Sequence, residues 1–239
     1  MFSSLSSVSA SSISEVEEDF ATFESKDLAT GDISTYEVEE ANADILPAYK
    51  GTAPYVEEIG TRSIIGADNR YQVKNADQVP YRYIAYVLST FPNGETYRGT
   101  AWLFAPDVAI TAAHVLYNAG RGGYATSVTI YPARQNDKMP YGAVGAKSVH
   151  VPTKYKESSA AGQNDIGNDV GVMVLKSNMG NRTGYFGIRK VAREESITGQ
   201  SVVLSGYPSD KGINMVKSSG TVLDTQKDRI TYNNDTVGG

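Results

Sequence analysis

The feature that most constrains the fold is a series of short strand-like runs between Tyr81 and Asp235, separated by turn residues such as Pro92-Asn93-Gly94. The runs follow one another at intervals of about 10–15 residues, a spacing typical of β-sandwiches and β-barrels. The clearest are YRYIAYVLST, YRGTAWLF, DVAIT, YATSVTIYPAR, DVGVMVLK, QSVVLSGYP, VKSSGTVLDTQ and RITYNND. We therefore expect an all-β protein.

Charge divides the chain into two parts. Residues 1–62 contain 3 basic and 13 acidic side chains, whereas the rest of the chain is mildly basic. Residues 1–62 are therefore interpreted as an acidic, weakly ordered leader, either simply solvated or covering a basic surface of the body. The Arg62-Ser63 dipeptide lies where the composition changes, and it is either a processing site or plain linker.

Several classes of protein are excluded by composition. The chain has no cysteine, so it forms no disulfide and no Cys-based metal site. No apolar run reaches the roughly 18 residues of a membrane span. The Ser-rich start MFSSLSSVSASS lacks the basic and apolar regions of a complete signal peptide, so either export uses another route or the true start lies upstream. We expect no metal, no cofactor, no nucleic acid and no membrane as partner.

Two histidines are present, and their settings differ. His114 follows the apolar run AIT and two alanines, a position where it is either a structural residue or a general base. A general base needs a buried carboxylate to orient its ring. Asp165 and Asp169 are the candidates, and Asp169 is preferred because it leads directly into the apolar run 170–175. His150 has no comparable setting and is expected to be exposed.

The same residues carry a resemblance to a known family. GTAWLFAPDVAITAAHVL and DVGVMVL resemble the segments that present the base and the carboxylate in trypsin-like serine proteases. GYPSDK, DTVGG, IIGADNRYQV and TGYFGI are similar to the bacterial glutamyl endopeptidases within that group. The resemblance covers residues 63–239 and implies two six-stranded barrels, with the catalytic groups between them and the second barrel incomplete in this chain.

The resemblance also assigns roles. His114 and Asp169 become the catalytic base and its partner, and Gly239 an oxyanion-hole donor. Thr236 and the new amino group at Ser63 would bind an acidic substrate side chain after cleavage near Arg62-Ser63. The nucleophilic serine would follow two residues after Gly239, whereas Ser205 and Ser209 lack a suitable turn. This chain alone is therefore expected to be inactive and unstable in its second half.

The implied function is a secreted, extracellular zymogen, a monomer that hydrolyses protein or peptide substrates after Glu and less often after Asp. Its partners would be those acidic substrates and an activating protease. Two alternatives stay open: a non-catalytic trypsin-like barrel that binds ligands or is a decayed protease, and an unrelated β protein in which His114 is structural.

Overall fold

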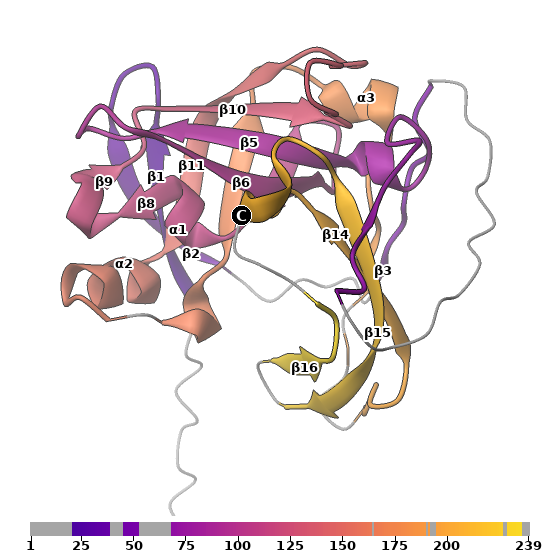
Figure 1. Ribbon diagram of the computed structural model, residues 1–239. Coiled ribbons are helices and arrows are strands. Elements are labelled where there is room, and N and C mark those ends of the chain that lie inside the picture. Colours follow the sequence, from indigo (N-terminus) through magenta and orange to yellow (C-terminus); the bar gives the residue numbers. More distant parts are fainter. Residues whose placement is uncertain are drawn as a thin grey trace, which may run out of the picture.

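The computed structural model describes residues 21–38, 45–52, 68–163, 165–189, 191, 195–226 and 229–235. Strands dominate this part of the chain, which confirms the all-β prediction (Figure 1). Four residues named above, Arg62, Ser63, Thr236 and Gly239, lie outside the described residues.

Six strands close into a barrel in the middle of the chain. They are β5 (Ile84–Thr90), β6 (Thr96–Leu103), β7 (Val108–Thr111), β10 (Ser127–Pro132), β11 (Val144–Pro152) and β12 (Gly171–Leu175). Their order is β10-β5-β6-β7-β12-β11, and antiparallel pairing between β10 and β11 joins the two ends. Closure leaves fewer free strand edges, which are otherwise prone to aggregation.

Alternation along these strands builds the barrel interior. In β12, for example, residues 171, 173 and 175 are buried while 172 and 174 are half-buried. Apolar side chains of 2% exposure or less therefore meet inside the barrel: Ala85, Val87, Ala101, Leu103, Ala109, Val128, Ile130, Ala146, Val149, Val151 and Met173. Burial of this apolar surface is the main stabilising contribution.

A second sheet lies beside the barrel. It contains β14 (Ser201–Gly206), β15 (Val216–Thr225) and β16 (Ile230–Tyr232), and β4 (Tyr71–Gln72) pairs with β15. The sheet is attached to β6 where the Thr100 hydroxyl accepts a hydrogen bond of 2.9 Å from the Tyr207 backbone N–H. The Tyr207 ring is 1% exposed and packs edge-to-face on Tyr86, with 5.5 Å between the ring centroids.

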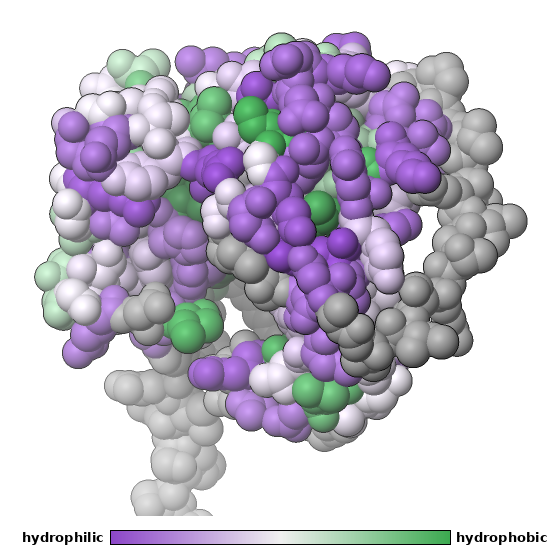
Figure 2. Space-filling model, viewed as in Figure 1, coloured by the Kyte–Doolittle hydropathy of each residue, from purple (hydrophilic) through white to green (hydrophobic). Residues whose placement is uncertain are grey.

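Short elements connect these strands. They are the β8–β9 pair (Tyr117–Asn118 and Gly123–Tyr124), helices α1 (Ala113–Leu116), α2 (Thr153–Ala160) and α3 (Met179–Thr183), and the 3-10 turns η1 (Tyr81–Tyr83), η2 (Ala119–Arg121), η3 (Ile166–Asn168) and η4 (Ser209–Lys211). None of the helices in the described ranges has the length and apolar character needed to cross a bilayer. Hydrophilic side chains cover the face over β14 and β15, with apolar ones scattered between them (Figure 2).

Part of the expected leader is built into this fold. β1 (Ala21–Asp27) and β2 (Ile33–Val38) form a hairpin, and β1 pairs with β11. β3 (Ile45–Leu46) pairs with β13 (Ile188–Arg189). The expectation of weak order in residues 1–62 thus does not hold for residues 21–38 and 45–52. Acidic composition does not reveal that these residues pair with strand edges of the body.

Candidate active site

The pairing of β7 with β12 brings together two segments that are far apart in the sequence. Thr111, at the end of β7, lies opposite Gly171, at the start of β12. His114 follows the first of these residues and Asp169 precedes the second, so both side chains lie at the same end of the barrel. A Cβ at Gly171 would lie 3.2 Å from the Ala113 Cα, so glycine lets α1 approach β12 closely.

His114 and Asp169 are joined by two hydrogen bonds. The ring Nδ1 of His114 lies 2.8 Å from Oδ2 of Asp169, and the backbone N–H of His114 donates to Oδ1 over 2.9 Å. The carboxylate is one-fifth exposed, while the imidazole is half exposed. Asp169 therefore fixes the ring plane and favours the tautomer with a proton on Nδ1, which leaves Nε2 free to accept a proton.

Asp169 carries a negative charge at neutral pH, as an acceptor of hydrogen bonds from His114 requires. Burial by itself raises the pKa of its carboxyl group, but the hydrogen bonds from the ring and backbone of His114 outweigh burial. The net pKa of Asp169 lies below its ordinary value of 3.8, so the group is a carboxylate at neutral pH.

Asp165 and His150 bond to other residues instead. Asp165 caps η3 by accepting hydrogen bonds of 3.2 and 2.8 Å from the backbone and side chain of Asn168. His150 is partly buried rather than exposed as expected. Its ring nitrogens lie 2.9 Å from the hydroxyls of Tyr36 and Ser148, and burial lowers its pKa. The hairpin explains that burial, because β1 pairs with β11 and β2, which pairs with β1, carries Tyr36 onto the ring.

His114 faces a cleft of about 510 Å³ between the barrel and the second sheet. The barrel contributes Thr100, Trp102, Thr111, Ala112 and His114, and the second sheet and its flanks contribute Arg70, Leu204, Ser205, Gly206, Tyr207, Pro208, Val216, Ser218, Tyr232 and Asp235. A ligand held there would touch both units. Ser205 thus shares the cleft with His114, although among the described residues the His114 ring hydrogen-bonds to Asp169 alone.

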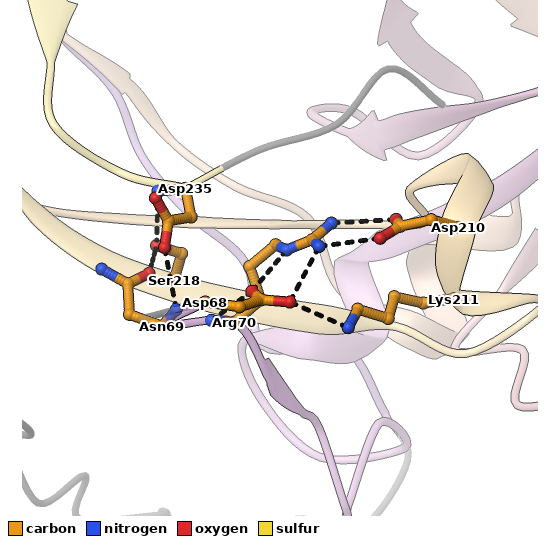
Figure 3. A network of polar contacts seen from close by, with 7 residues as sticks. All are labelled: Asp68, Asn69, Arg70, Asp210, Lys211, Ser218 and Asp235. Atoms are coloured by element: carbon orange, nitrogen blue, oxygen red, sulfur yellow. Dashed lines mark hydrogen bonds and ion pairs between the residues drawn. The ribbon is translucent and has the colours of Figure 1, made fainter. Parts of the chain in front are cut away.

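Arg70, Ser218 and Asp235 of the cleft lining belong to a polar network that was not predicted from the sequence. Figure 3 shows this network. Arg70 lies at its centre, with a side chain that is 9% exposed, 2.7 Å from both Asp68 and Asp210. Lys211 bonds to Asp68 over 2.9 Å. The Arg70 guanidinium holds the pKa values of both carboxyl groups below their ordinary range. Two cations and two carboxylates therefore compensate one another here.

The network continues to the end of the described chain. The backbone N–H of Asn69 donates to the Asp235 carboxylate over 2.8 Å, and the Asp235 N–H donates to the Ser218 hydroxyl over 3.1 Å. Ser218 in turn lies 2.5 Å from the Asn69 side-chain oxygen. The sequence motifs GADNRY and YPSDK contain Asp68, Arg70, Asp210 and Lys211. The contacts between the two motifs depend on tertiary structure, so the sequence alone did not reveal the network.

No group of three or more His, Cys, Asp or Glu side chains within the described ranges is arranged to hold a metal ion.

Comparisons with known proteins identify relatives of this chain among the trypsin-like proteases. The family model described as Trypsin matches residues 70–237. A glutamyl endopeptidase of Bacillus licheniformis is 30% identical over 188 residues, which cover 78% of this chain and 54% of that protein. A protein of Bacillus subtilis named extracellular metalloprotease is 28% identical over 185 residues, 77% of this chain and 57% of its own.

A solved structure described as Glu endopeptidase in complex with MPD superposes with a TM-score of 0.61 at 30% identity, covering 74% of this chain and 79% of that one. The present chain spans little more than half the length of the curated relatives. The family match, however, extends over most of the body, from β4 to the segment after β16. The chain therefore belongs to the trypsin family, with the double-barrel architecture of that group.

Proposed function

We propose that the protein to which this chain belongs is a serine endopeptidase with His114 as general base and Asp169 as its orienting carboxylate. The observation that carries the proposal is the 2.8 Å contact between His114 Nδ1 and Asp169 Oδ2 at the rim of a cleft. In a chain of the trypsin family, this contact directs the other ring nitrogen toward a bound substrate.

The chemistry follows from that orientation. A serine hydroxyl attacks the peptide carbonyl while His114 Nε2 accepts its proton, and the same nitrogen then protonates the leaving amine. The Asp169 carboxylate stabilises the imidazolium that forms in between. We assign the nucleophile to the serine that follows Gly239 in the resembling family, and an oxyanion-hole N–H to Gly239 itself. Both assignments lie outside the described residues.

We further propose a preference for Glu, and less for Asp, on the amino side of the cleaved bond. The 30% identity to a glutamyl endopeptidase supports this preference. An acidic substrate side chain needs positive charge and hydrogen-bond donors, since its unpaired burial is costly. Arg70 does not supply that charge because Asp68 and Asp210 already neutralise it.

The proposed cation is the amino group released at Ser63 by cleavage after Arg62, with the Thr236 hydroxyl as an additional donor. The hydrogen bond from Asn69 to Asp235 supports this arrangement, because it ties the start of the body to the residue before Thr236. The enzyme would thus be made as a zymogen. We also propose secretion, which the name of the Bacillus subtilis relative supports, and a monomeric state.

The test is a comparison of peptides that differ only at the residue before the scissile bond, using protein that includes the residues after Gly239. Cleavage after Glu in preference to Gln and Lys is expected, and Thr236→Val should lower kcat/KM for the Glu peptide. Cleavage without a Glu preference would refute the specificity alone. No cleavage and no labelling by a serine-directed phosphonate would refute the protease assignment and favour a binding module.

A further inference from the structure

The segment from residue 21 to 52, which we name the leader segment, contacts the body at two separate anchors. At the first, β1 pairs with residues 148–152 of β11. The neighbouring barrel strand β10 pairs with β11 at residues 144 and 145 and does not extend farther along it. The leader segment therefore occupies a stretch of strand edge that would otherwise present free backbone donors and acceptors.

Side chains of the body bond to side chains of the leader segment at the first anchor. Glu24 on β1 is 7% exposed, and Lys156 on α2 bonds to its carboxylate over 2.5 Å. A carboxylate is buried at acceptable cost only where such a partner exists. The hydroxyl of Tyr36 on β2 lies 2.9 Å from Nδ1 of His150. The Tyr36 ring stacks on the ring of Phe23, with 6.2 Å between the centroids.

The second anchor lies on α3 and the segment that follows it. The backbones of Tyr49 and Tyr185 exchange two hydrogen bonds of 3.1 and 2.8 Å. Arg82 of the body is completely buried and donates both to the Thr183 carbonyl, over 2.7 Å, and to the Lys50 carbonyl of the leader segment. Removing the leader segment would take an acceptor from this buried cation.

Gly187 shows most directly that the body accommodates the leader segment. A Cβ at Gly187 would lie 2.5 Å from the Leu46 carbonyl oxygen and 2.7 Å from the Ala48 nitrogen, both in the leader segment. The backbone of Gly187 is not in the left-handed region. The space that excludes a side chain here is therefore filled by the leader segment and not required by the turn itself.

The cleft is left open by both anchors. Of the described residues that line it, none belongs to residues 21–52. Figure 1 shows the hairpin, drawn in indigo, alongside β11.

We propose that the leader segment is a lasting structural partner of the body, which stays bound after the chain is cut between residues 52 and 68 and does not block the cleft. This partnership rests on packing and strand pairing, and it holds whether or not the proposed protease activity does.

The test uses the full chain with a recognition site for a specific protease inserted at residues 56–62. After cutting, size-exclusion chromatography in native buffer should return the leader segment and the body in one peak at equal amounts. Elution of the leader segment as a free peptide would overturn the proposal. Diethyl pyrocarbonate should acylate the half-exposed His114 of the cut complex faster than His150, whose ring nitrogens both bond to hydroxyls; protection of His114 would overturn the open cleft.

Two matched pairs of variants locate the contacts. Gly187→Ala should speed release of the cut leader segment about tenfold or more, as expected for overpacking at 2.5 Å. Its control is Gly145→Ala, whose Cβ would lie 3.6 Å from the Lys176 side chain. Should Gly187→Ala not fold, Glu24→Gln with Glu37→Gln as control tests the first anchor from the leader side. Equal release rates within either pair would refute the corresponding anchor.

Discussion

Gly171 is the position at which a single added methyl group should push helix α1, which carries His114, away from barrel strand β12. In Gly171→Ala, the new Cβ would lie 2.7 Å from Leu116 Cδ1 and 3.2 Å from the Ala113 Cα. Leu116 is fully buried, so its side chain has little room to rotate away. Such overpacking costs about 1–3 kcal/mol.

The free energy translates into a measurable shift of Tm. For a chain of this size, each kcal/mol lowers Tm by about 2–4 °C, so Gly171→Ala should melt about 2–12 °C below its control. The control is Gly145→Ala, where the added Cβ makes an ordinary contact of 3.6 Å. Both variants lose about 0.4–1 kcal/mol of chain entropy in the unfolded state, and this contribution cancels in the comparison.

Two readouts decide the outcome. Thermal unfolding followed by circular dichroism measures the difference in Tm. Proton NMR follows the strongly deshielded signal expected for an Nδ1 proton held between His114 and Asp169, which should broaden or shift when α1 moves. Equal Tm values and an unchanged signal in the two variants would refute the account of Gly171 as the residue that seats α1.

Three further outcomes are expected. Asp169→Asn should lower kcat by about 10⁴-fold in protein carrying the nucleophile, because an amide favours the wrong tautomer of the base; Asp165→Asn should leave kcat unchanged, and equal losses would contradict the assignment. Burial lowers the pKa of His150 from its ordinary 6.5, so the unfolded chain takes up a proton at this residue before the folded chain does. The contribution of neutral His150 to the free energy of unfolding should therefore be fully present above about pH 6.5 and fall on acidification below it. Thermal melts of His150→Gln should show a smaller fall of Tm. Since Arg70 lowers the pKa of Asp210 below 3.8, Asp210→Asn should reduce Tm above about pH 4 and have less effect at pH 3; a pH-independent effect would contradict the ion pair.

The strands of the body were largely predictable from the sequence. Each of the quoted runs from 81–90 to 229–235 contains an observed strand, because alternation and turn residues act locally. The nine-residue strand β11 was missed. A bulge between Ala146 and Ser148 shifts its register, so the buried positions change from 144 and 146 to 149 and 151, and the period of two is lost.

The candidate site was predictable where local sequence decides it. Asp169 was preferred over Asp165 because it precedes an apolar strand, and the contact with His114 agrees with that choice. The Arg70 network was beyond reach, since Asp210 lies 140 residues away and only the fold brings the two together. The same limit applies to His150, whose burial comes from a hairpin more than 100 residues earlier.

The antiparallel contact between β7 and β12 has a further consequence for assembly. His114 lies just after β7 and Asp169 just before β12, both strands of one barrel, while the second sheet forms the opposite wall of the cleft. The geometry of the His114–Asp169 pair is thus set within one barrel, whereas the shape of the cleft depends on how that barrel packs against the second sheet. A change in that packing would alter the width of the cleft while leaving the contact between His114 and Asp169 in place.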